Sequence, residues 1–309
     1  MRISRAPLRI SLGGGGTDLP HFRDHFGGFV ISQAINAYVY VTVAPRYDGR
    51  IRIATSIDQT VYSPEKIAHP IVREFFRIYR PTGGWDIHSS ADIDGSSGLG
   101  SSGAFTVALM TAFLGYPHNR QERAEEAYML ESGISECGPQ DHYAATYGEC
   151  HAFTFPAAHH NDSAHPVKLD SSNLLNALLM YDTGIRRRAD TSLKQVSLSD
   201  PQHLHTIKRS GEKLFEKMKE GRGKVYLPSL MRDHWAAKQK TQETPVEVTR
   251  MWERGMTAGA RAGKLIGAGG GGFMLFYVDI ETQSDVRNAM AAYREVPLKS
   301  GSGVTYWEI

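Results

Sequence analysis

The first third of the chain alternates between apolar runs of strand length and short polar or glycine-rich segments. Residues 9–12 form a short strand pattern that runs into four glycines, and residues 29–44 are rich in Val, Ile and Tyr. Residues 50–62 continue in this style, and residues 85–93 give a shorter, more polar strand pattern, so β-strands are predicted in all four places. Residues 64–79 place apolar side chains on one face at helical spacing, which predicts a helix.

Two further helices are expected before the middle of the chain. Residues 104–114 form an apolar run of helical length behind a loop of Gly and Ser. Residues 119–133 begin with Asn119 as N-cap, carry a Glu three residues later and end in Gly, so both helix ends are marked.

The second half of the chain predicts three consecutive helices. They cover residues 201–220, 228–240 and 245–262, and each has a proline at or near its first turn, where the missing N–H costs least. The other elements expected in this half are strands at 174–181, 273–278 and 304–309 and a helix at 283–293.

Strands and helices mix without a regular βαβ period, which favours an α+β fold over a doubly wound sheet. The 309 residues suffice for two domains. The polar, histidine-rich residues 156–166 are the best boundary candidate, so we expect domains at 1–160 and 161–309. Four side chains in this segment could in principle hold a metal, but their spacing is irregular and a plain loop is the preferred interpretation: His159, His160, Asp162 and His165.

Charge and cysteine content narrow the class of protein. Lys and Arg (35) nearly balance Asp and Glu (33), so no strong field points to nucleic acid or a membrane surface. Cys137 and Cys150 are too few for a disulfide framework and suit a reduced compartment. No stretch approaches the ~20 apolar residues of a membrane span. We expect a cytoplasmic protein that binds neither nucleic acid nor membranes; a homodimer is compatible with the sequence.

The central glycine loop is the strongest chemical signal. Glycines let a backbone approach a ligand closely, and successive N–H groups at a helix N-terminus bind phosphate. A flexible linker would not run straight into the apolar helix at 104–114. Phosphate or nucleotide contacts are therefore expected from the whole loop: Gly95, Ser96, Ser97, Gly98, Leu99, Gly100, Ser101, Ser102 and Gly103.

Two common phosphate loops fit this segment poorly. A Walker A loop needs a Lys after the glycines, and none is present. Gly98, Gly100 and Gly103 match G-x-G-x-x-G, but that fingerprint follows a buried apolar strand. The preceding segment instead contains polar residues such as Asp86 and His88. The serines at the helix start suit hydroxyl contacts to phosphate and Mg²⁺.

Three segments resemble the three motifs of the GHMP kinases, in the family's order. Residues 5–20 resemble the first motif, in the form found in D-glycero-D-manno-heptose 7-phosphate kinases. Residues 95–105 resemble the family's phosphate loop, and residues 264–273 resemble its third motif. One such match would be weak, whereas three that span nearly the whole chain are a strong signal.

The resemblance implies a two-domain kinase fold with the active site in the interdomain cleft and ATP as phosphate donor. Asp141 matches the family's catalytic Asp, and Arg9 matches the cation beside it. Ser102 and Glu131 match the Mg²⁺ contacts, which suits a metal that keeps phosphate and water ligands; a solvated helix residue is the alternative for Glu131. Pro139 and His142 depart from the Lys and Gln of relatives, so substrate contacts there can differ.

Sugar contacts are expected from the first loop, where a carboxylate lies beside a hydroxyl, although a simple capped turn would give the same sequence. Arg186 begins a run of three arginines, and a planar guanidinium suits a phosphate on the substrate; a solvated charge run is the alternative. The expected substrate contacts are Gly15, Gly16, Thr17, Asp18, Asp141, Thr183, Gly184, Arg186, Gly270 and Gly271.

The leading hypothesis is an ATP- and Mg²⁺-dependent kinase that phosphorylates the anomeric hydroxyl of D-glycero-D-manno-heptose 7-phosphate, giving the 1,7-bisphosphate for activated-heptose synthesis. The alternatives are an anomeric kinase for another sugar, such as L-fucose or a galactose-like sugar, and a non-catalytic sensor of sugar and nucleotide. The presence of Arg9, Ser102, Glu131 and Asp141 favours an enzyme over a sensor.

Overall fold

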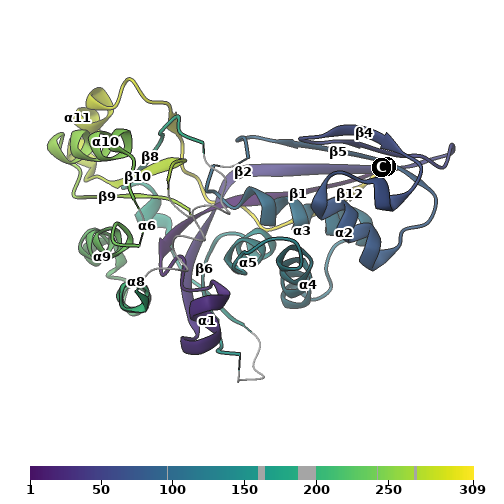
Figure 1. Cartoon of the computed structure of the whole chain (residues 1–309). Helices are drawn as coiled ribbons and strands as arrows, with labels where there is room; N and C mark the ends of the chain where they lie inside the picture. The colour runs from purple at the N-terminus through teal and green to yellow at the C-terminus, as the bar shows by residue number, and fades with distance from the viewer. Residues whose placement is uncertain (96, 159–163, 187–199, 242, 268–269) are drawn as a thin grey trace.

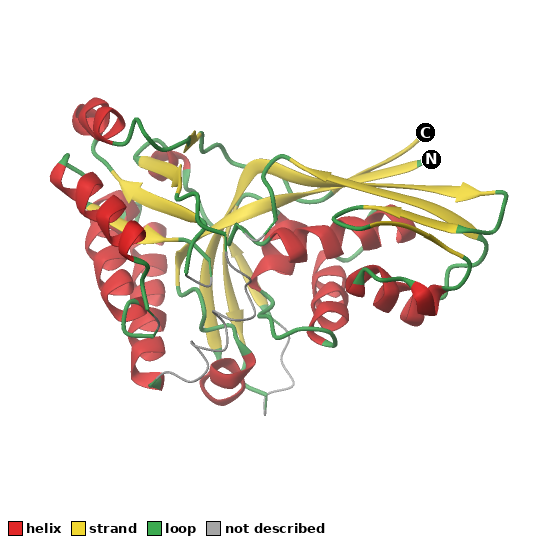
Figure 2. Cartoon of the chain, turned by 45° about the horizontal axis from the view of Figure 1, so that its top comes forward, coloured by secondary structure: helices red, strands yellow, loops and turns green. Residues whose placement is uncertain are grey.

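Two β-sheets and the helices that cover them make up the fold. The computed structural model describes residues 1–95, 97–158, 164–186, 200–241, 243–267 and 270–309, and the helices gather around both sheets (Figures 1 and 2). In the described part of the chain, no helix is long and apolar enough to cross a membrane.

The larger sheet is built around two long antiparallel strands, β1 (Arg2–Gly13) and β2 (Gly28–Arg46). Its main strand order is β12-β1-β2-β5-β3-β4; in addition, β6 pairs with the first half of β2, and β7 pairs with β6. The other strands are β3 (Ile51–Ala54), β4 (Asp58–Val61), β5 (Gly84–Ala91), β6 (Cys150–Phe155), β7 (His165–Lys168) and β12 (Thr305–Glu308).

Helix α3 (Ser101–Leu114) packs directly on β1 and β2. Every residue from Gly103 to Phe113 is buried, which explains why this helix is apolar all round rather than along one stripe. Beside it lie α2 (Pro70–Tyr79), α4 (Arg120–Ser132) and α5 (Gln140–Tyr147) on the same side of the sheet (Figure 1).

The smaller sheet has the order β11-β8-β10-β9. Helix α9 covers one face, and α10 and α11 cover the other (Figure 1). Because both faces are buried, the five residues of β10 are all apolar or aromatic and all buried. The bounds in this part are α6 (Ser172–Leu175), β8 (Leu178–Asp182), α8 (Pro201–Lys219), α9 (Gly223–Lys238), α10 (Val246–Thr257), β9 (Ala262–Leu265), β10 (Phe273–Tyr277), α11 (Gln283–Ala289) and β11 (Glu295–Val296).

The expected α+β class is confirmed, and three local expectations need correction. The helix expected at 64–79 is a short 3₁₀ turn, Pro64–Lys66, followed by α2, since Pro70 restarts the chain as a helix. The strand expected from residue 174 begins only at Leu178, after the short helix α6. Helix α1 (Pro20–Phe26) follows the first glycine loop and was not expected.

Besides these three, a fourth correction concerns Pro228, which lies inside α9 and not in its first turn. Proline has no N–H, so the carbonyl four residues earlier, on Lys224, loses its normal helical partner. The hydroxyl of Tyr277 donates to that carbonyl at 3.2 Å. A side chain from β10 therefore replaces the missing helical hydrogen bond and ties α9 to the smaller sheet.

The sheets bear on where the two expected domains meet. Strand β7 pairs with β6 and extends the larger sheet to Lys168. Strand β12 returns to pair with β1, where Ile3 lies opposite Trp307, and the Met1 ammonium donates to the Ile309 carbonyl at 2.6 Å. The division at residue 160 stays a proposal, and this pairing favours a boundary just after Lys168 with the last strand returning to the first unit.

Candidate active site

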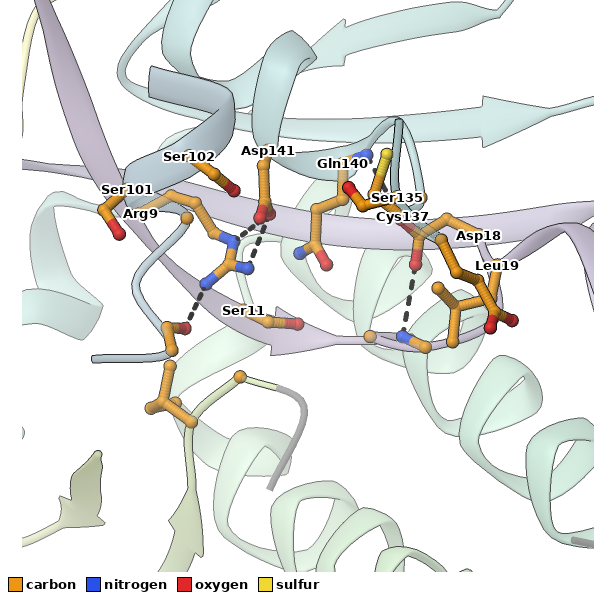
Figure 3. Close-up of a pocket in the computed structure, with 18 of the residues that line it drawn as sticks. Arg9, Ser11, Asp18, Leu19, Ser101, Ser102, Ser135, Cys137, Gln140 and Asp141 are labelled. Atoms are coloured by element: carbon orange, nitrogen blue, oxygen red, sulfur yellow. Dashed lines mark hydrogen bonds and ion pairs between the residues drawn. The ribbon is translucent and has the colours of Figure 1, made fainter. Parts of the chain in front are cut away.

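A cavity of about 430 Å³ lies where the glycine loops of the larger sheet meet the helices and strands of the smaller one. This volume is in the range of small-molecule sites. The larger sheet, its loops and its helices contribute Arg9, Asp18, Ser102 and Asp141 to the lining, and α9 contributes Lys238. Figure 3 shows Arg9, Asp141 and the serines of α3 at one end and Asp18 with Leu19 at the other, with Ser11 and Gln140 between them.

The central glycine loop ends in a helix N-terminus that is open for an anion. Gly100 is the N-cap of α3, has φ of 77° and offers no side chain to cap the first turn. The N–H groups of that turn are therefore free for an external acceptor, which is how helix N-termini bind phosphate. Ser101 and Ser102 line the cavity beside it, together with Gly98 and Gly100.

The remaining residues of this loop have different environments. Leu99 is fully buried, and its carbonyl accepts the N–H of Arg9 at 2.9 Å. Ser97 is buried with no partner for its hydroxyl among the described atoms. Gly95 is exposed, and Ser96 lies outside the described residues. The loop also packs on the third glycine loop, since a Cβ on Gly98 would lie 2.9 Å from the carbonyl oxygen of Ile266.

Glycine is required where α3 meets the start of α5. A Cβ on Gly103 would lie 2.7 Å from the Cβ of Asp141, and one on Gly100 would lie 3.0 Å from the Asp141 carboxyl carbon. Real Cβ atoms essentially never approach as closely as the first distance, and the second is tighter than most real Cβ contacts. These two glycines therefore allow the phosphate loop to lie directly against Asp141.

Arg9 and Asp141 form the central ion pair of the site. The Nε of Arg9 donates to Oδ1 of Asp141 at 2.7 Å, and Nη2 lies 2.5 Å from the same oxygen. Its Nη1 donates to the Gly98 carbonyl at 2.6 Å (Figure 3). The Asp141 side chain keeps 25% of its surface exposed, so the carboxylate is oriented from behind while it still faces the cavity.

Asp18 is buried at the other end of the cavity. Its carboxylate accepts the N–H of Gly16 at 3.2 Å and that of Gln140 at 3.1 Å (Figure 3). Burial raises the pKa of Asp18, and the negative charge of Asp141 raises it further, although the backbone donors oppose the shift. A Cβ on Gly138 would lie 2.1 Å from an Asp18 oxygen, so this approach also depends on a glycine.

Its neighbour Thr17 is not part of the cavity lining that the structure describes. The Thr17 hydroxyl donates to the carbonyls of Gly14 and Phe29 at 2.8 and 2.9 Å and accepts the Phe29 N–H at 3.1 Å. These bonds hold the first glycine loop against β2. The structure thus gives Thr17 a structural environment, whereas Gly15 and Gly16 do line the cavity.

Ser102 and Glu131 both line the cavity beside the phosphate loop. Burial opposes the ionised form of Glu131, but the His142 charge and hydrogen bonds from His142, Ser102 and Thr106 prevail and lower its pKa. An ionised carboxylate next to a hydroxyl is the oxygen donor set that Mg²⁺ accepts with phosphate and water, so these residues fit a magnesium ion. Nε2 of His142 lies 2.8 Å from Oε2 of Glu131, which leaves Oε1 for a ligand.

The expected contacts near the smaller sheet are only partly brought to the cavity. Gly271 lines it. Thr183 donates its hydroxyl to the Gly272 carbonyl at 2.8 Å, and Gly184 donates its N–H to Asp182 at 2.8 Å. Arg186 binds both carboxylate oxygens of Asp182, at 2.7 and 2.6 Å. Thr183, Gly184, Arg186 and Gly270 are not in the described lining.

Some of the residues that the sequence singled out lie outside the described part of the chain. Arg187 and Arg188, and His159, His160 and Asp162 of the boundary segment, fall outside the described residues. His165 lies in β7 and is exposed. Among the described residues, no group of three or more His, Cys, Asp or Glu side chains is arranged to hold a metal.

Sequence reasoning missed three buried basic residues that line the cavity. His234 and Lys238 from α9 and Lys264 from β9 line the cavity and are buried. Lys264 is the first residue of the segment that resembles the third motif, and this place in the motif could have indicated that it lies at the site. Nothing in the pattern of α9 distinguished Lys238 from the exposed Lys240 two residues later.

Comparisons with known proteins now decide the family. A model of the GHMP kinases N terminal domain matches residues 65–149. The chain is 31% identical to the D-glycero-alpha-D-manno-heptose 7-phosphate kinase of Campylobacter jejuni, over 89% of both chains. The chain belongs to the GHMP kinase family. The predicted resemblance to this family is thereby confirmed, and the protein is an enzyme, a sugar kinase.

A solved structure and a second sequence relative agree with this assignment. A D-glycero-D-manno-heptose 1-phosphate kinase from Bacteroides thetaiotaomicron superposes with a TM-score of 0.80 and 25% identity, over 100% of this kinase and 99% of that chain. The galactokinase of Chloroflexus aurantiacus is 27% identical over 60% of this kinase and 50% of its own length. GHMP kinases use ATP as phosphate donor, generally with Mg²⁺.

Proposed function

We propose that this kinase transfers the γ-phosphoryl group of ATP to the anomeric hydroxyl of D-glycero-D-manno-heptose 7-phosphate, giving the 1,7-bisphosphate for activated-heptose synthesis. The observation that carries this proposal is the position of the Arg9–Asp141 pair between the open N-terminus of α3 and the buried Asp18. The named heptose 7-phosphate kinase, alike over 89% of both chains, supports this choice of sugar.

In this proposal the donor phosphates lie at the start of α3, on the loop of residues 95–103. Ser102 and Glu131 would hold Mg²⁺, which supplies positive charge to the donor phosphates when bound. The sugar lies between Asp18 and Asp141, with Gly15, Gly16 and Gly271 beside it. Asp18 would accept hydrogen bonds from sugar hydroxyls, since its carboxylate already has two backbone donors and faces the cavity.

The chemical step uses the carboxylate that Arg9 orients. The anomeric oxygen forms a bond to the γ-phosphorus, the bond from that phosphorus to the β–γ bridging oxygen breaks, and ADP leaves. The proton of the anomeric hydroxyl passes to Asp141. Phosphoryl transfer needs little more from a protein than positioning and charge stabilisation, and Arg9 adjoins the point where negative charge spreads. We also propose a cytoplasmic location, because the reaction consumes ATP.

A sugar panel tests this function. ADP release would be measured with the heptose 7-phosphate, the unphosphorylated heptose, L-fucose and galactose, and ³¹P NMR would locate the new phosphate. We expect the highest kcat/KM with the heptose 7-phosphate and a phosphate on the anomeric carbon. Preference for galactose would favour the second candidate, which the likeness to galactokinase supports over 60% of the chain. Sugar binding without any turnover would favour the sensor.

A further inference from the structure

Three buried basic side chains form the wall of the cavity that α9 and β9 contribute. His234 and Lys238 lie one turn apart on α9, and Lys264 lies on β9. Their exposed fractions are 3%, 9% and 2%, and all three line the cavity. Burial, together with the charges of the two lysines, lowers the pKa of His234 well below its usual value, so the cations of the cluster are the two lysines. Burying two ammonium groups together is costly unless their charge is compensated. We therefore expect groups that accept hydrogen bonds or carry negative charge next to this cluster.

The protein itself supplies only some of the hydrogen-bond acceptors that the two lysines need. Nζ of Lys238 donates to the carbonyls of Leu265, at 3.1 Å, and Gly267, and Nζ of Lys264 donates to the carbonyl of Leu12 at 3.1 Å. An ammonium has three N–H donors, so these bonds leave one N–H on Lys238 and two on Lys264. In the part of the chain that the structure describes, neither ammonium has a carboxylate within ion-pair distance, and the charges that act on the two lysines are all positive.

His234 adds an unpaired atom to the same wall. Its Nδ1 is buried and has no hydrogen-bond partner among the described atoms. Burial lowers the pKa of Lys238 to about 7, and the charge of Arg9 adds to the effect. Burial, followed by the charges of Lys238 and Arg9, lowers the pKa of Lys264 well below its usual value. A polyanion in the cavity would relieve both the missing hydrogen bonds and the mutual repulsion.

Two phosphates can reach this cavity: the γ-phosphoryl group of ATP and a phosphate carried by the sugar. The donor phosphates already have a site at the open N-terminus of α3. Arg186 was expected to bind the sugar phosphate. Its guanidinium instead donates two hydrogen bonds to Asp182, and Arg186 is not in the described lining of the cavity. The observations therefore favour the sugar phosphate as the ligand of the basic wall.

We propose that His234, Lys238 and Lys264 form the subsite that binds the phosphate monoester of the acceptor sugar. The inference rests on the proposed function, because it assumes an acceptor that carries a phosphate away from its anomeric carbon. The subsite and Asp141 then hold opposite ends of the sugar. Such two-point binding fixes the anomeric oxygen in line with the γ-phosphorus.

Steady-state kinetics of Lys238→Met test the subsite. With saturating ATP, we expect KM for heptose 7-phosphate to rise about tenfold or more, the usual effect of losing a charged hydrogen bond. KM for the unphosphorylated heptose and KM for ATP should change less than about twofold. Lys240 lies two residues further along, in the turn after α9, and is exposed. Lys240→Met is therefore the matched control and should behave as wild type. Equal changes for both sugars, or a raised KM for ATP, would overturn the proposal.

A binding measurement separates this inference from the proposed function. Inorganic phosphate would be titrated into protein saturated with a non-hydrolysable ATP analogue, which fills the donor site. Phosphate should raise Tm of wild type and Lys240→Met and leave that of Lys238→Met unchanged. The same rise in all three proteins would overturn the subsite, even if wild type turned over neither heptose and the proposed function failed. Should Lys238→Met not fold, Lys238→Gln, which keeps a donor without the charge, takes its place in both measurements.

Discussion

Arg9 donates from Nε to the carboxylate of Asp141 at 2.7 Å, although 132 positions separate the two residues. Arg9 comes from the middle of β1 and Asp141 from the first turn of α5. The same guanidinium holds the Gly98 carbonyl, so one side chain joins the larger sheet, the phosphate loop and the helix that carries the carboxylate. Any change at Arg9 is therefore expected to act on both the donor and the acceptor side of the reaction.

Replacing Asp141 by Asn should leave the shape of the site intact and remove its proton acceptor. We expect kcat to fall by roughly 10²–10⁴, the span for a positioned base, with little change in ATP affinity. Steady-state kinetics and nucleotide titration measure the two quantities. Asp58→Asn, at an exposed position of β4, is the matched control. A near-normal kcat for Asp141→Asn would remove Asp141 as the base.

Arg9→Ala should also lower kcat, because it removes positive charge that matters most as the phosphoryl group moves. If the two residues act as a unit, the double variant with Asp141→Asn should lose far less activity than the product of the two single losses. The measurement is a double-mutant cycle on kcat, with thermal melts to verify folding. Losses that simply multiply would mean that the pair has separate roles.

Gly103→Ala should damage the enzyme through packing alone. The added Cβ would meet the Cβ of Asp141 at 2.7 Å and the backbone of His142 at 3.2 Å, so α3 and α5 must separate. We expect a loss of about 1–3 kcal/mol in the free energy of unfolding, as for overpacking elsewhere, together with a lower kcat. Gly133→Ala is the control, because its Cβ would meet only ordinary contacts at 3.6 Å or more. A Gly103→Ala enzyme with normal Tm and kcat would contradict this packing argument.

Lys238 gives the stability a pH dependence with a defined sign. Its pKa in the folded protein is lowered to about 7 from 10.5, chiefly by burial. Between these values the unfolded chain binds more protons than the folded one, so stability rises with pH, by up to about 1.4 kcal/mol per pH unit for one group. Removing Lys238 should therefore favour the fold most at pH 6 and progressively less towards pH 9.

Thermal melts of Lys238→Met and wild type from pH 6 to pH 9 measure this difference. Lys264, whose pKa is also lowered by burial, remains in both proteins and contributes to both curves. The exposed Lys240→Met should run parallel to wild type over the whole range. Parallel curves for Lys238→Met would show that its ammonium is not desolvated in the folded protein.

Tyr277→Phe tests whether the Tyr277 hydroxyl replaces the helical hydrogen bond that α9 lacks at Pro228. The hydroxyl donates to the Lys224 carbonyl at 3.2 Å, and Pro228 has no N–H to replace it. We expect a loss of about 1 kcal/mol in the free energy of unfolding, with kcat unchanged because Tyr277 does not line the cavity. Chemical denaturation measures it, with Tyr62→Phe, at a 79% exposed position, as control. An unchanged midpoint would mean that solvent satisfies that carbonyl.

Residue types and spacing predicted the larger part of the fold and the frame of the site. The signal was clear where local rules decide the structure, as at the Asn119 cap, which accepts the N–H groups of Gln121 and Glu122. A cap of this kind is written in adjacent residues. Asp18 was singled out because a carboxylate follows a glycine loop, and it does line the cavity, while its contact with sugar stays a prediction. In these places the backbone and its nearest neighbours determine the outcome.

Tertiary partners decided the rest. Thr17 looks like a ligand for sugar in sequence, yet its hydroxyl is used by the backbone of Phe29 on the next strand. Arg186 looks free, yet Asp182, one helical turn's spacing earlier, binds it. Lys238 looks like any lysine at a helix end until α9 packs on β9 and buries it. No local pattern contains those contacts.

The pairing of β12 with β1 also affects how the protein can fold during synthesis. Strand β1 leaves the ribosome before the other strands of the larger sheet, but the partner on its outer side is made only after residue 304. Until then that edge has unpaired N–H and C=O groups, the kind of edge that invites pairing with another nascent chain. We expect the larger sheet to close late, and ribosome-bound chains that stop before residue 305 to depend most on chaperones.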